Sequence, residues 1–135
     1  MDRPADSIIT WTPYRKIFLT EKNNTKGNEF CTMKKNTLAP AEKDYVEQPE
    51  IIVATLGLET RYGTYTGNYR VIDALSTLGL EYPRRSKYVL AELKNFLLLT
   101  DEHKLDPLAV TGSYAGAIGL PQFMPSSYRS YAVDF

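Results

Sequence analysis

Hydrophobic residues recur every three or four positions in several stretches of the chain, which is the spacing of one helix face. The strongest stretch follows Pro49 and Glu50, because proline and an acidic residue both suit the first helical turn. The pattern predicts helices over residues 34–45 (interrupted by Pro40), 49–60, 70–78 and 86–100, and another helix beginning at Pro125. No strand-length alternation is visible, so the sequence predicts a mainly α fold.

Irregular stretches separate these helices. Residues 23–28 contain three asparagines and a glycine and are predicted to form a loop. Residues 62–67 and 112–125 combine glycines with tyrosines or small residues. Loops carry many binding and catalytic residues, so these are the expected positions of a site.

Composition narrows the possible functions. The chain has 135 residues, which suits one domain, predicted to span residues 1–135. Sixteen basic residues balance sixteen acidic ones, so no basic excess favours nucleic-acid binding. One histidine and one cysteine provide neither a zinc ligand set nor a histidine-based triad. No apolar run has membrane-spanning length, and the polar residues 1–7 do not form a signal peptide.

Glu59 is the first candidate for chemistry. Ile52, Leu56 and Glu59 fall at positions i, i+4 and i+7, which places the carboxyl group on the apolar helix face. Burial there would raise its pKa and suit a general acid that protonates a glycosidic oxygen. The alternative is a glutamate at a frayed helix end, exposed or paired with Arg61.

The glycine-rich residues 112–125 form the second candidate. Their small residues allow close backbone approach, and Ser113 and Gln122 could hydrogen-bond an amide or hydroxyl of a ligand. The spacing does not match a dinucleotide-binding loop. The alternative is tight helix packing, with Ser113 as a cap.

Arg84 and Arg85 precede the helix predicted to begin at Ser86, which could cap it. Cations at a helix N-terminus oppose the macrodipole, so another interaction should hold them there. An anionic ligand would do so, and so would a structural salt bridge with Glu81 or Asp73.

Several of these motifs together resemble one family. The residues Gly57-Leu58-Glu59-Thr60-Arg61-Tyr62-Gly63 are similar to the catalytic helix of the membrane-bound lytic murein transglycosylase B family. The blocks Asp73–Leu78, Tyr82–Arg85, Gly112–Gly119 and Gln122–Tyr128 also resemble it, in the same order. The resemblance runs from about Trp11 to the last residue.

The resemblance implies a lysozyme-like, mainly helical catalytic domain. It implies cleavage of the MurNAc–GlcNAc bond of bacterial peptidoglycan without water, giving 1,6-anhydro-MurNAc ends, with Glu59 as single acid and base and no cofactor. The resemblance also implies a set of substrate-binding residues. Ser113 and Gln122 would hold the N-acetyl or lactyl groups, and Tyr14, Tyr88 and Phe123 would line the sugar subsites. Arg84 and Arg85 would face the anionic groups of the muramyl unit.

The chain also departs from the family. Relatives continue well beyond Phe135, so the resemblance implies a C-terminally truncated domain whose cleft a missing segment or a partner would complete. Asp134 stands where relatives open a calcium loop, but one carboxylate cannot form an oxygen cage, so no metal is expected. Cys31 stands where an aromatic residue is expected. By resemblance the protein would be periplasmic or associated with the outer membrane.

Three other functions stay open at this point. The chain could be an inactive peptidoglycan-binding remnant, as the absent C-terminal segment would suggest. It could be a hydrolase of the same fold that uses water and leaves reducing ends. It could also be a helical interaction protein without affinity for sugars. Cleavage products and binding to purified sacculi distinguish these alternatives.

Overall fold

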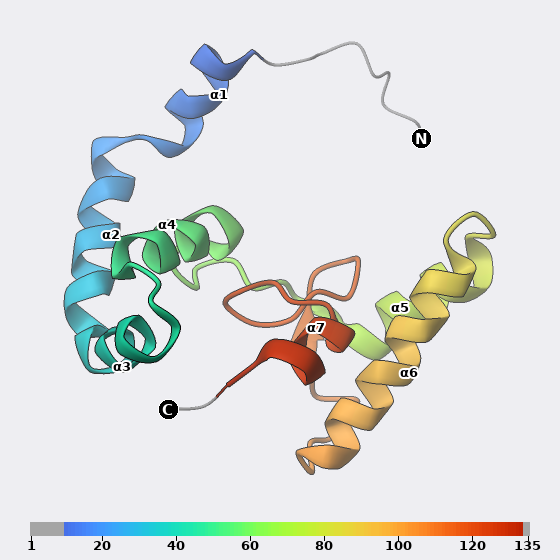
Figure 1. Ribbon diagram of the computed structural model, residues 1–135. Helices are drawn as coiled ribbons and strands as arrows, with labels where there is room; N and C mark the ends of the chain where they lie inside the picture. Colours follow the sequence, from blue (N-terminus) through green and yellow to red (C-terminus); the bar gives the residue numbers. More distant parts are fainter. Residues whose placement is uncertain (1–9, 134–135) are drawn as a thin grey trace. The chain divides into compact units, whose positions relative to one another are not determined.

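The computed structural model describes residues 10–133. Seven helices and two short strands lie in this part of the chain, which confirms the predicted mainly α fold (Figure 1). The elements are α1 (Trp11–Phe18), α2 (Glu21–Met33), α3 (Lys35–Tyr45), α4 (Pro49–Thr60), β1 (Tyr69–Arg70), α5 (Val71–Glu81), α6 (Ser86–Glu102), β2 (Thr111–Gly112) and α7 (Pro125–Tyr131). The chain divides into two compact units, Met1–Leu58 and Glu59–Phe135. A single catalytic domain over residues 1–135 stays a prediction.

The first unit consists of helices. Its buried hydrophobic side chains among the described residues are Phe30, Leu38 and Val53, and α1 buries none. The prediction of a loop over residues 23–28 is wrong, because these residues lie inside α2. The Thr20 hydroxyl accepts a hydrogen bond from the backbone N–H of Asn23 and so caps the helix start, a local signal that outweighs the loop composition.

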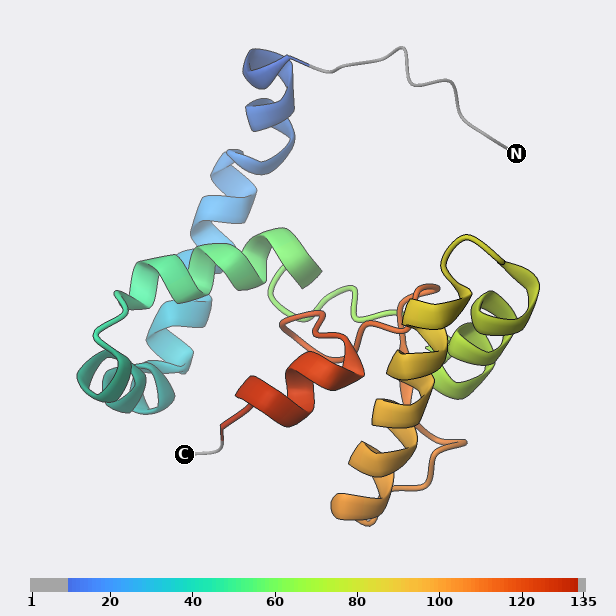
Figure 2. The same ribbon diagram turned by 45° about the vertical axis from the view of Figure 1, so that its right-hand side comes forward.

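The second unit is organised around α5 and α6. These helices lie side by side in both ribbon views (Figures 1 and 2) and are joined by a short turn. Their contact buries the core residues Val71, Leu75, Val89 and Phe96. The prediction that Ser86 caps α6 is wrong: Ser86 is the first residue of the helix, and its hydroxyl donates to the carbonyl oxygen of Gly79 at 2.5 Å. This hydrogen bond joins the start of α6 to α5.

A small antiparallel ribbon accompanies these helices. Tyr69 pairs with Gly112 and Arg70 with Thr111, and single bridges continue from Gly112 to Ile118 and from there to Phe123. Strands of two residues are too short to show alternation, which explains why the sequence pattern did not reveal them. At Gly112 an added Cβ would collide with the carbonyl of Ala117, so this turn of the glycine-rich loop requires glycine.

The glycine-rich loop therefore folds back on itself beside α5.

No helix in the described part of the chain is long and apolar enough to cross a membrane.

Candidate active site

Glu59 lies in the last turn of α4, and its side chain is exposed. The expectation that it is buried on the apolar face is wrong. The buried stripe of α4 runs through Val53 and Thr60, and at 100° per residue Glu59 lies about 120° around the helix from Val53. The carboxyl group is thus accessible to a ligand.

Thr60, the next residue, fixes the end of this helix. It is 1% exposed, and its hydroxyl donates to the carbonyl oxygen of Leu120 at 3.1 Å and accepts from the backbone N–H of Gly63 at 3.0 Å. Gly63 has φ of +84°, and an added Cβ would lie 2.8 Å from the Leu120 side chain. The end of α4 that carries Glu59 is therefore attached to the glycine-rich loop.

Arg61 does not pair with Glu59 in the described part of the chain. Its guanidinium group lies 5.5 Å from the centre of the Tyr65 ring, a cation–π distance. Among the described residues Glu59 is thus exposed, as the alternative interpretation expected, but it forms no ion pair with Arg61.

Ser113 and Gln122 both organise the glycine-rich loop. The Ser113 hydroxyl oxygen accepts hydrogen bonds from the N–H groups of Ala115 and Ala117, at 3.3 and 3.0 Å. The Gln122 amide nitrogen donates to the carbonyl oxygens of Thr66 and Gly119, at 3.1 and 2.9 Å. These bonds use the oxygen of Ser113 and the nitrogen of Gln122. The Ser113 hydroxyl proton and the Gln122 carbonyl oxygen are the groups left to offer a ligand.

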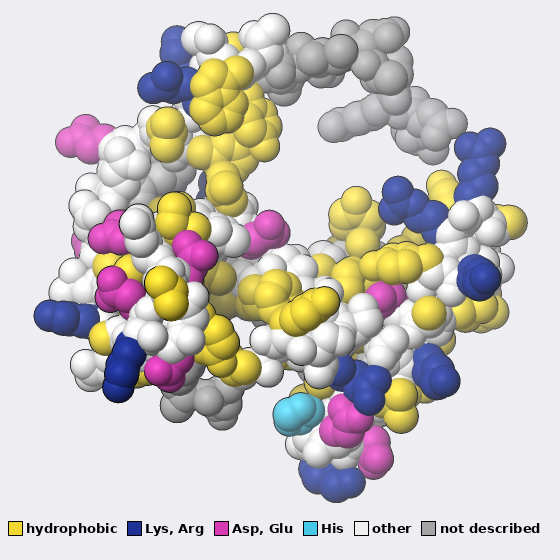
Figure 3. Space-filling model, viewed as in Figure 1, with side chains coloured by type: hydrophobic (Ala, Val, Ile, Leu, Met, Phe, Trp, Pro, Cys, Tyr) yellow, Lys and Arg dark blue, Asp and Glu magenta, His cyan; other side chains and the backbone are white. Residues whose placement is uncertain are grey.

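Arg84 and Arg85 lie in the turn between α5 and α6, where Figure 3 shows Lys and Arg side chains gathered. With Lys87 they border an open hollow. The alternative of a salt bridge with Asp73 is wrong, because Asp73 pairs with Arg70 at 2.6 Å. No salt bridge joins either arginine to Glu81 in residues 10–133.

An aromatic pocket of about 440 Å³ adjoins this basic hollow. Arg85 and Tyr88 line both, so the structure brings these two predicted residues together. The pocket is lined by Leu78, Tyr82, Arg85, Tyr88, Val89, Tyr114, Ala115 and Met124. Sequence reasoning missed the roles of Tyr82 and Tyr114, although both stand in the motifs that carry the resemblance. Their spacing gives no sign of a shared pocket.

Phe123 and Tyr14 have other surroundings. Phe123 is half-buried and packs edge-on against Tyr128, with ring centres 5.9 Å apart. Tyr14 belongs to the first unit, where its ring lies between Trp11 and Phe18 along α1. The centre of the Tyr14 ring is 6.3 Å from that of Trp11 and 5.2 Å from that of Phe18. Their predicted roles at sugar subsites stay predictions.

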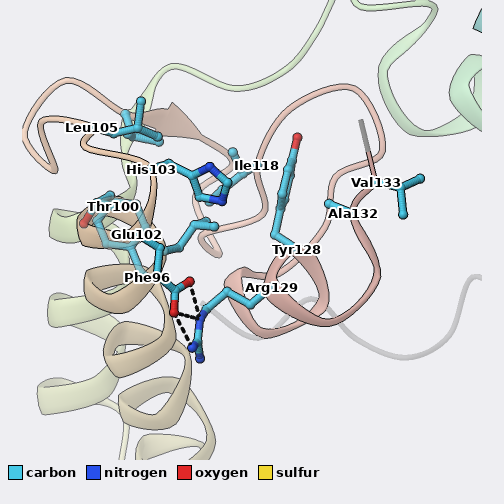
Figure 4. A pocket seen from close by; sticks show the side chains of 12 residues that line it. Phe96, Thr100, Glu102, His103, Leu105, Ile118, Tyr128, Arg129, Ala132 and Val133 are labelled. Atoms are coloured by element: carbon cyan, nitrogen blue, oxygen red, sulfur yellow. Dashed lines mark hydrogen bonds and ion pairs between the residues drawn. The ribbon is translucent and has the colours of Figure 1, made fainter. Parts of the chain in front are cut away.

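A second cavity, of about 610 Å³, lies between the end of α6 and α7 (Figure 4). No predicted site residue lines it. At its edge Arg129 binds both carboxylate oxygens of Glu102, with a shortest distance of 2.6 Å. The hydrogen bonds from Arg129 hold the pKa of Glu102 below its usual value; partial burial opposes them, and the charges of Arg129 and His103 reinforce them.

Glu92 was not singled out from the sequence. It is 3% exposed, and its two carboxylate oxygens accept from the backbone N–H and the hydroxyl of Ser126, at 2.9 and 2.7 Å. From the sequence it looks like one more polar residue of a long helix, because its partner lies 34 residues further along the chain.

No cluster of three histidine, cysteine or acidic side chains that could hold a metal occurs among the described residues. Asp134, the expected start of a calcium loop, and the polar residues 1–7 lie outside them.

Comparison with known proteins places this fold among the lysozyme-like lytic transglycosylases. Residues 1–135 match the transglycosylase SLT domain, and the chain belongs to this family. The membrane-bound lytic murein transglycosylase B of Escherichia coli K12 is 48% identical over 132 residues, which are 98% of this chain and 37% of that protein.

Two solved structures from Pseudomonas aeruginosa are also similar. The soluble lytic transglycosylase SltB1 superposes with a TM-score of 0.96 at 53% identity, over 98% of this chain and 45% of its own. SltB3, in complex with NAG-NAM-pentapeptide, superposes with a TM-score of 0.86 at 31% identity, over 92% of this chain and 33% of its own. This chain thus spans less than half the length of each of these relatives.

Proposed function

We propose that this protein binds peptidoglycan glycan strands and cleaves the MurNAc–GlcNAc bond by a lytic transglycosylase reaction, with Glu59 as its acid and base. Family membership supports the reaction class. The observation that carries the assignment of Glu59 is its exposed carboxyl group at a helix end that Thr60 fastens to the loop of Ser113 and Gln122.

One carboxyl group suffices for both halves of this reaction. Protonated Glu59 donates its proton to the glycosidic oxygen as the bond from that oxygen to C1 of MurNAc breaks. The N-acetyl oxygen of the same sugar stabilises the positive charge at C1. Ionised Glu59 then removes the proton from the C6 hydroxyl as its oxygen bonds to C1, which closes the 1,6-anhydro ring and regenerates the acid. Because Glu59 is exposed in the free chain, the bound sugar itself would have to exclude water from it.

The other predicted residues would hold the strand. The Ser113 hydroxyl proton and the Gln122 carbonyl oxygen could bond the oxygen and the N–H of an N-acetyl group. Arg84 and Arg85 are not paired with the acidic residues suggested for them, which supports a role in binding carboxylates of the muramyl unit or its peptide. SltB3 was crystallised with a glycan fragment that carries a peptide, which makes such a substrate the natural choice.

Peptidoglycan as substrate would place the protein in the periplasm or at the outer membrane. The name of the E. coli relative, a membrane-bound enzyme, supports this location.

The test is to incubate purified peptidoglycan with the wild-type chain, with Glu59→Gln and with Glu50→Gln, and to analyse the soluble products by mass spectrometry. Glu50 is an exposed glutamate in the first turn of the same helix and is the matched control. We expect anhydromuramyl products from wild type and Glu50→Gln, and a loss of at least about 10³-fold in Glu59→Gln, because no second acid would replace it. Reducing-end products would instead identify a hydrolase.

A second candidate function is peptidoglycan binding without turnover. The groups that Ser113 and Gln122 leave for a ligand favour it, because they would hold a sugar whether or not Glu59 acts as an acid. Absence of products together with equal binding of wild type and Glu59→Gln to sacculi would establish this function. Absence of binding would leave a helical interaction protein.

A further inference from the structure

The turn that follows α4 has an unusual backbone. Arg61, Tyr62 and Gly63 are consecutive and all have positive φ, of +48°, +59° and +84°. Only glycine adopts this left-handed region freely, because a Cβ crowds the backbone there. Within the turn, the backbone N–H of Tyr65 donates to the carbonyl oxygen of Thr60 at 2.9 Å. A turn with two strained residues needs contacts from elsewhere in the chain to keep its shape.

The bend at residues 119–122 supplies such contacts at both ends of the turn. At its start, the Thr60 hydroxyl donates to the carbonyl oxygen of Leu120 at 3.1 Å. At its end, the side-chain nitrogen of Gln122 donates to the carbonyl oxygen of Thr66, also at 3.1 Å. The two bonds span 60 and 56 residues of sequence and enclose the turn between them. The segment that leaves α4 is therefore joined to the glycine-rich loop twice.

The side chain of Gln122 is held in one orientation. Its amide nitrogen also donates to the carbonyl oxygen of Gly119 at 2.9 Å, so both amide hydrogens bond within the chain. The reverse orientation of the amide would set its oxygen against two carbonyl oxygens, so the two acceptors decide which end of the amide faces Thr66. Gln122 itself has φ of +51°, a conformation that a residue other than glycine keeps only when its surroundings fix it.

We propose that Gln122 is a positioning residue for Glu59: its amide nitrogen holds the end of the turn, as Thr60 holds its start, and the two bonds together keep the Glu59 carboxyl group where it acts. The inference rests on the proposed function, because it takes Glu59 to be the acid and base. The amide oxygen of Gln122 remains the group that faces a ligand. The two roles belong to two atoms of one side chain, so substitution can separate them.

Two variants make this separation. Gln122→Glu keeps the length of the side chain and an oxygen acceptor but loses the nitrogen that donates to Thr66 and Gly119. Gln122→Met keeps the length without adding charge and loses both the donor and the acceptor. Gln48→Glu is the matched control, because Gln48 is the other glutamine of the chain and is exposed before the start of α4. We expect this control to behave as wild type in both measurements below.

The first measurement is amide hydrogen exchange by NMR and needs no ligand. We expect Gln122→Glu and Gln122→Met each to speed exchange of the Gly63 and Tyr65 N–H groups about tenfold, because loss of the bond to Thr66 lets the turn open. The N–H of Phe96, in the core, should change less than about threefold. Unchanged exchange in the turn would overturn the proposal. Equal acceleration at Phe96 would also overturn it, because Gln122 would then support the whole unit and not this turn.

The second measurement is kcat and KM for a soluble tetrasaccharide of alternating GlcNAc and MurNAc. We expect both Gln122 variants to lower kcat at least about tenfold, because the acid is misplaced. The KM of Gln122→Glu should stay within about threefold of wild type, since the oxygen acceptor is kept. A raised KM with unchanged kcat would make Gln122 a ligand contact only and overturn this proposal alone. Failure of wild type to cleave the tetrasaccharide would overturn the proposed function, whatever the exchange rates.

Discussion

The two units differ in the sequence span of the side-chain hydrogen bonds described for them. In the first unit, the Thr55 hydroxyl bonds the carbonyl of Ile51, four residues away, and the Asn23 side chain bonds that of Phe18, five residues away. In the second unit, the bond from Thr60 to Leu120 spans 60 residues. The bonds from Gln122 to Thr66 and from Ser126 to Glu92 span 56 and 34.

Burial follows the same division. Phe96, Leu75 and Val71 are fully buried in the second unit, whereas α1 of the first unit has no buried residue. Long-range hydrogen bonds around a closed core hold side chains in fixed positions, while a helix with an exposed aromatic row depends on its own turns. The contrast teaches that Glu59, Ser113 and Gln122 belong to a scaffold held by distant contacts, and that Tyr14 stands on a locally stabilised helix.

The largest expected effect comes from the core of the second unit. Phe96→Ala should lower the free energy of unfolding by about 3–5 kcal/mol, because it removes a fully buried ring and leaves a cavity. Chemical denaturation followed by circular dichroism measures this loss. Leu97→Ala, at an exposed position on the same helix, is the control and should cost well under half as much. Similar losses for the two variants would show that burial of the Phe96 ring does not hold this core together.

A smaller effect is expected where Thr60 joins α4 to the loop. Thr60→Val keeps the shape but leaves the Leu120 carbonyl and the Gly63 N–H without this partner, and should cost about 1–3 kcal/mol. Glycan cleavage should fall with it, because Glu59 loses its attachment to the loop. The control is Thr55→Val, an exposed position whose hydroxyl bonds only within its own helix.

Denaturation and product analysis of the Thr60 and Thr55 variants measure both effects. A loss of stability in Thr60→Val with full activity would show that the attachment does not position Glu59.

The smallest effect concerns the ion pair of Glu102 and Arg129. Because the folded-state pKa of Glu102 lies below its unfolded value, the pair stabilises the protein above the unfolded pKa, and this contribution is lost as the pH falls through the folded pKa. Wild type should therefore melt slightly higher than Glu102→Gln at pH 7, and the gap should close as the pH is lowered through the folded-state pKa of Glu102. A gap that stays constant throughout an acid titration would show that Glu102 stabilises α7 by contacts other than its charge.

Much of the helical fold could be predicted from the sequence. The predicted limits of α4 agree with the structure, because Pro49 starts the helix and a glycine-containing turn follows Thr60. The sequence pattern did not predict α1, and it predicted a loop over residues 23–28, which lie inside α2. In α2 the capping bond of Thr20 outweighs a composition rich in asparagine, and such a bond depends on backbone geometry that composition does not report.

The candidate site was predictable in its residues but not in their surroundings. The helical pattern and the family resemblance both led to Glu59, yet the pattern placed it on the buried face. Which face of α4 is buried depends on contacts such as that of Thr60 with Leu120, across 60 residues. The sequence identifies Ser113 and Gln122 as polar residues in a loop of small residues. Their hydrogen bonds to Ala117 and Thr66 are set by the tertiary structure.

The sequence by itself determined where α4 and α6 run and which family the chain resembles, because apolar spacing, a proline at a helix start and ordered motifs are local properties of the chain. Only the tertiary structure decided that Glu59 is exposed and that Glu92 is buried against Ser126. The physical reason is that burial and hydrogen-bond partners arise between segments distant in sequence, and a one-dimensional pattern does not record which of them meet.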